Sequence, residues 1–224
     1  MRDLCIDTSV GANVAVVTDE GVYAVREANP RAHAERLAVL IERALTEAGL
    51  SPHAGTAGLD QVIVGTGPAT FTGLRAGLIT ARVIATVAGV PLRGIPSLDI
   101  LARNYLDGLA PDDEVVVVTD ARRKEVYWAR YRPLGPNDVE CVEGPHVATP
   151  DSVANRFRDD ELIFAGPACQ LYPDALPTSQ STMDVQVDIA SRIVRARLLS
   201  GGTEFSTEPL YLRRPDIHPG KGAR

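Results

Sequence analysis

The chain has 224 residues, of which 45% are apolar and 23% are charged, and its formal net charge is −6. This composition is that of an ordinary soluble globular protein, and the length is enough to bury a core in one domain or two small lobes. A protein that binds nucleic acid by itself usually presents a basic surface. The negative net charge of this chain therefore argues against direct binding of nucleic acid.

The three cysteines, Cys5, Cys141 and Cys169, lie far apart, and none of them forms a CxxC pair. This usage favours a reducing, cytoplasmic setting without a zinc site. The sequence enters a strand pattern directly after Met1, and its apolar runs are shorter than a bilayer requires. We therefore expect neither a signal peptide nor a membrane span.

Predicted strands and helices alternate in the first half of the chain. Residues 4–8 form a buried strand, and residues 13–18 and 22–27 form a hairpin around an Asp-Glu-Gly turn. A helix is expected over 32–48 and a strand over 61–64. The further elements expected are a helix over 73–88 with Thr72 as its N-cap, a strand over 92–95 and a third helix capped by Ser97. This order predicts one twisted mixed sheet with helices on its faces.

The second half partly repeats the first after a Gly-, Pro- and Asp-rich linker at 107–113. Strands are expected at 115–119, 126–131 and 161–165, and a helix at 187–199. We expect an N-terminal lobe at 1–106 and a C-terminal lobe at 107–224 that ends in an irregular tail. The basic residues of that tail are interpreted as solvated: Arg213, Arg214, Lys221 and Arg224.

Four segments, in order along nearly the whole chain, carry a resemblance to a known family: LCIDTSVGANVAVV, GTGPATFTGLRAGL, TDARRKEVYWARY and EPLYLRRP. They resemble the TsaB (YeaZ) family, within the actin, sugar-kinase and heat-shock ATPase superfamily. The resemblance implies an α/β fold of the actin-like (ribonuclease H-like) type. Two lobes would each hold a mixed sheet flanked by helices.

The resemblance also implies a function. Members of the family are non-catalytic scaffold subunits of the complex that forms threonylcarbamoyladenosine next to the anticodon of tRNAs reading codons that begin with A. The implied partners are the catalytic paralogue TsaD and the ATPase TsaE, with tRNA contacted only indirectly and a homodimer when the chain is alone. This chain would bind no cofactor by itself, whereas the complex uses ATP and magnesium.

The residues themselves argue against metal chemistry. The catalytic paralogue holds its metal with an HxxxH pair, and the matching positions here are Ser97 and Leu101. Leucine has no lone pair to donate, and a neutral serine hydroxyl is a poor ligand. The four histidines are scattered: His33, His53, His146 and His218. We therefore expect no metal site and no catalytic residue, and we interpret His33 as a polar residue at a helix entry, with a partner contact as the alternative.

Two strand-end acidic residues leave a residual nucleotide contact open. Asp7, followed by Thr8 and Ser9, and Asp120 stand where actin-like ATPases keep acidic residues near phosphates and magnesium. The loop after Asp7 has one glycine, and the loop after Asp120 has none, whereas phosphate-wrapping loops use glycines for close approach. The alternative is that both aspartates cap strands.

Two helices of the first lobe suggest a subunit interface. The helix at 73–88 carries small residues four apart, which allow close approach, while the first helix carries an apolar stripe. With Leu74, Leu78, Ile79 and Val83 left to cover the sheet, we interpret the remaining apolar surface as a partner or dimer interface. Its predicted residues are Leu37, Leu40, Ile41, Ala44, Arg75, Gly77, Ala81 and Ala85. Arg75 would either bind a carboxylate across the interface or tie down the preceding loop.

Two alternatives remain. The segment at 121–131 carries cations and aromatics that suit RNA, but its alternation favours a hairpin with a core face. The chain as a whole could be an independent actin-fold ATPase, a phosphotransferase or a metalloprotease-like enzyme. These enzymes need the glycines or the metal dyad that the sequence lacks.

Overall fold

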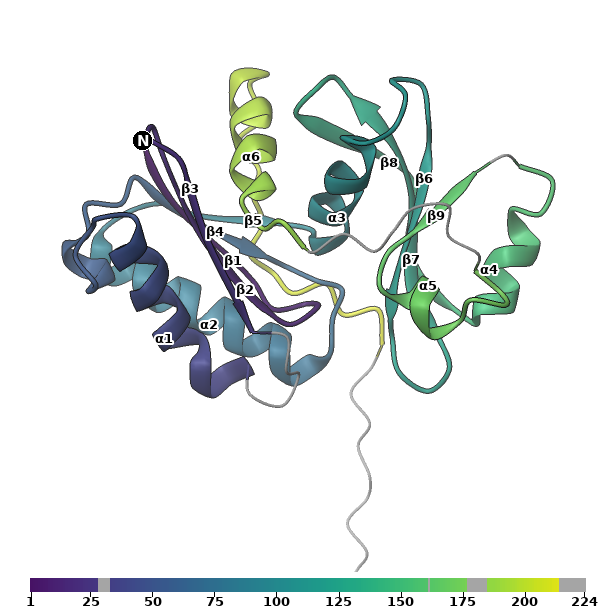
Figure 1. Ribbon diagram of the computed structural model, residues 1–224, viewed down its shortest axis with the longest axis horizontal. Helices are drawn as coiled ribbons and strands as arrows, with labels where there is room; N and C mark the ends of the chain where they lie inside the picture. The colour runs from purple at the N-terminus through teal and green to yellow at the C-terminus, as the bar shows by residue number, and fades with distance from the viewer. Residues whose placement is uncertain (28–32, 161, 177–184, 214–224) are drawn as a thin grey trace, which may run out of the picture.

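The computed structural model describes residues 1–27, 33–160, 162–176 and 185–213, and the side chains of residues 33–35 lie outside this description. Two mixed β-sheets stand side by side, each flanked by helices (Figure 1). The two-lobed α/β fold expected from the sequence is therefore confirmed. The interpretations of His33, His218 and the basic residues after Arg213 fall outside the described side chains.

The first sheet has five strands in the order β3-β2-β1-β4-β5. Their bounds are β1 Arg2–Asp7, β2 Ala12–Thr18, β3 Val22–Glu27, β4 Gln61–Gly65 and β5 Leu92–Ile95. β1 pairs antiparallel with β2 and parallel with β4, so β1 lies at the centre and its carboxyl end faces the same edge as that of β4. The central strands are apolar on both sides because helices cover both faces of this sheet.

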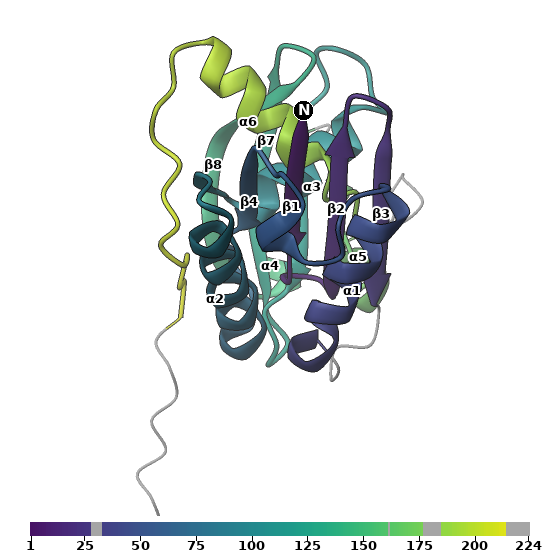
Figure 2. The ribbon, with the colours of Figure 1, turned by 90° about the vertical axis from the view of Figure 1, so that its left-hand side faces the viewer.

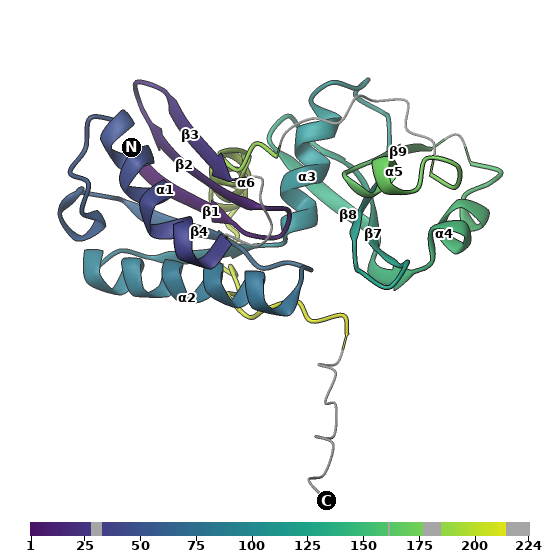
Figure 3. The same ribbon diagram turned by 60° about the horizontal axis from the view of Figure 1, so that its bottom comes forward.

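Helices α1 (His33–Glu47) and α2 (Phe71–Ala88) lie side by side on one face, with the 3₁₀ turn η1 (Ala54–Thr56) beside them (Figure 3). Leu45 and Leu74 join the core against Ile6 and Val64. The other face is covered by α6 (Ile189–Leu199), whose Ile193 packs into the cluster that contains Cys5 and Ile63.

The second sheet has the order β8-β7-β6-β9. Its strands are β6 Val115–Asp120, β7 Val126–Leu134, β8 Asp138–Ala148 and β9 Ile163–Ala165. Helix α3 (Ser97–Leu106) packs on one face, and α4 (Pro150–Arg156) and α5 (Ala168–Leu171) pack on the other. The two sheets lie on either side of the expected division at residues 106 and 107. However, α6, from the second half of the chain, packs on the first sheet, and α3, from the first half, packs on the second.

A buried ionic cluster joins the two helices that lie between the sheets. Arg197 of α6 contacts Asp99 of α3 at 2.8 Å and Asp138 of β8 at 2.9 Å. The Tyr131 hydroxyl donates to Asp99 at 2.9 Å. Burial raises the pKa of Asp99, and the charge of Arg197 opposes that shift. The lobes are therefore tied together by a charge network as well as by apolar contact.

The segment 203–213, which we call the strap, crosses the open edge of the first sheet (Figure 2). The N–H of Gly94 on the edge strand β5 donates to Phe205 O at 3.2 Å, and Leu210 N–H donates to Thr66 O at 2.9 Å. A Cβ atom at Gly94 would lie 1.9 Å from Ser206 O, so only glycine permits this approach. The strap thus covers backbone groups that an edge strand would otherwise leave bare.

Several predicted boundaries were wrong. Helix α2 begins at Phe71 after Thr70, not after Thr72, and Pro96 rather than Ser97 stands at the N-cap of α3. β8, α4 and α5 were not predicted from the sequence. By length and composition, α2 is the one candidate membrane span within the described residues, which is weak evidence because a core helix passes the same test.

Candidate functional site

The carboxyl end of β1 carries Asp7 in a closed hydrogen-bond network. Its side chain is only 1% exposed. Oδ1 accepts from the backbone N–H of Ser9 at 2.8 Å and from the Ser9 hydroxyl, while Oδ2 accepts from the Ser97 hydroxyl at 2.5 Å. Burial raises the pKa of Asp7, and these hydrogen bonds oppose the shift. Both carboxylate oxygens already have protein partners.

Ser97 holds the first turn of α3 against this carboxylate. Its hydroxyl also accepts the N–H of Gly67 at 3.0 Å. A Cβ atom at Gly65 would lie 1.7 Å from Asp7 Oδ2, so the loop after β4 closes over the carboxylate. Leu101, one turn further along α3, is buried in the second lobe's core. Ser97 and Leu101, the two positions at which the sequence could have placed metal ligands, are thus a hydrogen-bonding serine and a core leucine.

Thr8 turns away from solvent. It is 3% exposed, and its hydroxyl donates to Gly73 O at 2.9 Å. A Cβ atom at Gly77 would lie 2.4 Å from Thr8 Oγ1. The small residue at 77 is therefore required for contact between α2 and the end of β1 in the same chain.

Asp120 ends β6 in the second lobe and caps the following turn. Its Oδ1 accepts the N–H of Arg122 at 2.7 Å, and the Arg122 guanidinium lies 3.3 Å from Oδ2. Residues Arg122, Arg123 and Lys124 all have positive φ, between 55° and 63°. Asp120 thus acts as a strand-end cap. Trp128 and Tyr127 of the neighbouring strand β7 are buried, so the expected hairpin with a core face is present.

No cluster of three or more His, Cys, Asp or Glu side chains that could hold a metal occurs in the part of the chain that the structure describes. His53 lies exposed beside η1, and the His146 ring packs 5.1 Å from the Trp128 ring. Asp7 is enclosed and Asp120 is paired to Arg122, so both strand-end carboxylates already have partners within the chain.

The residues predicted for the subunit interface require a correction. All of them except Arg75 are buried inside this chain, against the first sheet or between α1 and α2: Leu37, Leu40, Ile41, Ala44, Gly77, Ala81 and Ala85. Ala81 is 0% exposed. The small residues of α2 face their own sheet because close packing there needs them, so they cannot meet a partner.

The surface that α1 and α2 do present is made by other residues. On α2, Ile79, Val83 and Val87 are 63%, 56% and 68% exposed, and Val39 on α1 is 57% exposed. The assignment of Ile79 and Val83 to the sheet was therefore wrong. Only 28% of the apolar α2 segment is buried. Large apolar side chains exposed in a row are uncommon on a protein that works alone.

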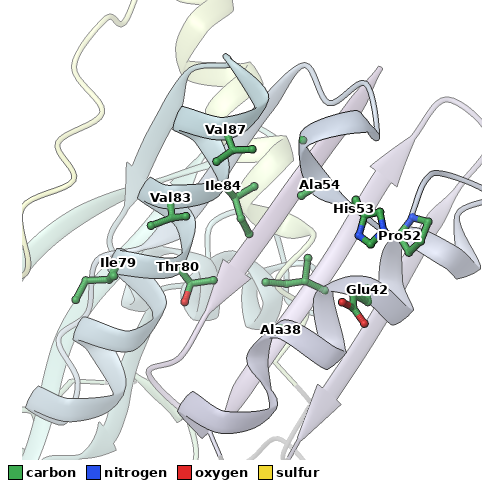
Figure 4. Close-up of a pocket in the computed structure, with 12 residues that line it drawn as sticks. Ala38, Glu42, Pro52, His53, Ala54, Ile79, Thr80, Val83, Ile84 and Val87 are labelled. Carbon is green, nitrogen blue, oxygen red and sulfur yellow. The ribbon is translucent and has the colours of Figure 1, made fainter.

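A groove of about 470 Å³ runs between the two helices. Figure 4 shows Val83, Ile84 and Val87 of α2 on one side and Ala38 of α1 on the other, with Pro52, His53 and Ala54 at one end. The walls are largely apolar, and Glu42 adds a carboxylate at the α1 side. The exposed row and the groove together form an open, largely apolar surface on α1 and α2.

Arg75 lies at the end of this surface and ties down the C-terminal strap. Its guanidinium stacks on the Phe71 ring, 3.6 Å from the centroid, and its Nε donates to the Tyr211 hydroxyl at 2.9 Å. The Phe71 and Tyr211 rings are 5.2 Å apart. The sequence suggested a carboxylate across an interface or the preceding loop as the partner of Arg75. The observed partner is Tyr211, which lies 136 residues away in the sequence.

Comparisons with known proteins agree with this architecture. The family model described as TsaD, tRNA N6-adenosine threonylcarbamoyltransferase, matches residues 21–183. An uncharacterized protein of Mycobacterium tuberculosis is 35% identical over 96% of this chain and 93% of its own length. The tRNA threonylcarbamoyladenosine biosynthesis protein TsaB of Escherichia coli is 32% identical over 78% of this chain and 74% of its own length. The chain spans 56% of the length of a longer Mycobacterium leprae relative.

Solved structures show the same fold. YeaZ from Pseudomonas aeruginosa superposes with a TM-score of 0.75 at 25% identity, covering 94% of this chain and 99% of that one. A second structure, titled as an uncharacterized protein with similarity to peptidase YEAZ from the same organism, gives a TM-score of 0.77 at 24% identity. It covers 95% of this chain and 99% of its own.

Proposed function

The chain belongs to the TsaB (YeaZ) family of tRNA threonylcarbamoyladenosine biosynthesis proteins, and from this premise we propose that it is a non-catalytic scaffold subunit that binds TsaD through α1 and α2. In this role it supports formation of threonylcarbamoyladenosine next to the anticodon of tRNAs that read codons beginning with A. TsaE is the further proposed partner, and the chain contacts tRNA only through the complex, in the cytoplasm.

The observation that carries this proposal is the exposed apolar row Ile79, Val83 and Val87 beside the groove between α1 and α2. A stable protein interface buries about 1,600 Å² in total and depends on a few central anchors. Two adjacent helices, one of 15 and one of 18 residues, offer a face of that scale. Large aliphatic side chains at its centre supply the anchors.

The likeness between this chain and TsaD supports TsaD as the partner of this face. The TsaD family model matches most of this chain, so the two proteins share the lobe that carries α1 and α2. Helix pairs of the same shape pack readily against each other in a four-helix arrangement. The same argument makes a homodimer through this face the proposed state when TsaD is absent.

The enclosed strand ends support the proposal that this chain is not catalytic. Ser97 and Asp7 satisfy each other, and Leu101 is part of the core, so a metal or a phosphate would have to displace hydrogen bonds and packed side chains. We propose that this chain binds no cofactor alone, and that ATP and magnesium are used by the assembled complex.

Reconstitution tests the scaffold proposal. Purified TsaD, TsaE, ATP, magnesium and the threonylcarbamoyl donor are incubated with tRNA, with and without this chain, and the modified nucleoside is measured together with the size of the assembly. We expect modification only when the chain is present, and a loss of both assembly and modification with Val83→Arg. Modification that proceeds equally without the chain contradicts the scaffold role.

Calorimetry on the isolated chain separates the scaffold from the enzyme class. ATP with magnesium is titrated into the protein, and release of phosphate is followed in parallel. We expect no heat of binding in the micromolar range and no turnover. Tight binding with hydrolysis by the chain alone would instead support an actin-fold ATPase or phosphotransferase.

A further inference from the structure

The C-terminal strap lies next to the exposed face of α2, and we propose that it forms one end of the TsaD-binding surface, with Tyr211 as its contact residue. This inference rests on the proposed function, because it extends the same interface. It assigns a binding role to a segment for which the sequence predicted none.

Five exposed residues of α2 follow each other at intervals of four: Phe71, Arg75, Ile79, Val83 and Val87. Side chains four apart on a helix are neighbours, and each step turns by about 40° around the axis. The row therefore winds from the groove side of α2 at Val87 to the strap side at Phe71. A partner that covers Val83 and Ile79 and extends around this side of α2 reaches Arg75.

Tyr211 sits on the Phe71 end of this row. It is 38% exposed, and Phe71 is 37% exposed, with the Arg75 guanidinium bonded to the tyrosine hydroxyl and stacked on the phenylalanine ring. Two aromatic rings around one arginine form a continuous surface with the aliphatic row. Tyrosine and arginine are also the residue types that most often dominate binding energy at interfaces.

The strap is fixed in place before any partner arrives. The Leu210 N–H bonds to Thr66 O, and Arg82 of α2 lies 3.4 Å from the Thr207 hydroxyl. Beyond Tyr211, Arg213 pairs with Glu125 of the second lobe. A surface held in its bound shape loses little conformational entropy on association, which favours binding. Figures 2 and 3 show the strap leaving the first lobe beside α2.

The occupant we assign is TsaD, the partner proposed for the rest of the α2 face, because the strap surface is continuous with that face. The chemistry of the surface predicts what the partner presents there. An apolar side chain suits the exposed ring of Tyr211, and an acceptor such as a carboxylate suits the guanidinium of Arg75.

Titration calorimetry of full-length variants against purified TsaD tests the proposal. Tyr211→Ala removes the ring, Tyr211→Phe removes only the hydroxyl, and Glu208→Ala changes another exposed residue of the strap. We expect Kd to rise at least tenfold for Tyr211→Ala, to rise less for Tyr211→Phe, and to stay unchanged for Glu208→Ala. Val83→Arg serves as the reference for loss of the α2 face.

A second measurement needs no variant. Hydrogen exchange of the backbone amides at 205–212 is compared in the free wild-type chain and in its complex with TsaD, and we expect slower exchange in the complex. Unchanged exchange there, or an unchanged Kd for Tyr211→Ala while Val83→Arg abolishes binding, overturns the strap proposal and leaves the proposed function standing. Full binding by Val83→Arg overturns the proposed interface itself.

Discussion

The hydroxyl of Ser97 donates a hydrogen bond to Asp7 Oδ2 over 2.5 Å, although the two residues are 90 positions apart in the sequence. This contact fixes the start of α3 to the end of β1. It also occupies the position at which the catalytic paralogue is expected to carry a metal ligand. The small hydroxyl at this position satisfies Oδ2 of the buried carboxylate, whose Oδ1 is bonded to Ser9.

The buried carboxyl of Asp7 predicts a pH dependence. Burial raises its pKa above the ordinary 3.8, so the folded state holds the proton more tightly than the unfolded state between 3.8 and the raised value. The free energy of unfolding therefore falls as pH rises through that window. Asp7→Asn removes this contribution. The free energy of unfolding of the wild type and of Asp7→Asn is measured with urea from about pH 3.5 to 7. We expect the wild-type value minus the variant value to fall as the pH rises.

Asp19→Asn is a control whose stability difference should depend on pH in the opposite direction. A hydrogen bond from the N-terminal amine lowers the pKa of Asp19, so its contribution to stability is lost as pH falls. The corresponding wild-type minus variant difference should rise with pH. A difference for Asp7→Asn that also rises, or stays flat, contradicts the assignment of a desolvated carboxyl at the end of β1.

A pair of arginine substitutions on α2 separates the core side of that helix from its binding side. Ala81 is 0% exposed, and Val83 is 56% exposed. Ala81→Arg buries an unpaired charge and should lower the free energy of unfolding by more than about 3 kcal/mol. Val83→Arg should change it by less than about 0.5 kcal/mol and abolish only TsaD binding. Thermal unfolding and co-purification together check both; a folded Ala81→Arg protein would refute the packing.

The ionic cluster between the lobes predicts that one substitution strongly lowers the free energy of unfolding. Arg197→Leu leaves Asp99 and Asp138 buried without their cation, at a cost of roughly 3–5 kcal/mol. Arg132→Leu removes an exposed ion pair with Glu140 and should cost about 0–1 kcal/mol. Urea unfolding measures both. Equal losses would show that the pair with Arg197 is no more than a surface contact.

Substitution of Gly94 tests how closely the strap packs against β5. In Gly94→Ala the added Cβ would collide with Ser206 O, so the strap must move away from β5, with a loss of about 1–3 kcal/mol. The amide of residue 94 should then exchange faster. Gly21→Ala is the matched control, since its Cβ would have only Tyr23 Oη within 4 Å, at 4.0 Å. Similar exchange at residue 94 in the two variants would contradict close strap contact.

Much of the first sheet follows from local patterns. β3 and β5 begin and end at the residues predicted, because Gly, Pro and acidic turn residues bound each apolar run. β8 did not follow, since Glu140, Glu143 and Pro145 interrupt its pattern. Its strand conformation depends on pairing with β7, a nonlocal interaction that no short window reveals.

The exposed apolar face of α2 was harder to predict, because both sides of this helix are apolar. Small residues such as Gly77 permit close approach by any neighbour, and the sequence does not say whether that neighbour is a partner or Thr8 of the same chain. The exposed line through Ile79 and Val83 becomes visible only when the sheet occupies the other side. Likewise, the contact between Arg75 and Tyr211 depends on where the chain end returns.

The placement of α6 has a consequence for how the protein is made. The Cys5 and Ile63 side of the first sheet is covered by residues near 189–199, which a ribosome synthesises after both sheets. During translation the N-terminal lobe emerges with one face bare and waits for the last helix to arrive. Because Arg197 of the same helix also pairs with Asp99 and Asp138, both lobes are completed only when α6 arrives. We therefore expect a nascent chain that is stalled before α6 to expose this apolar face.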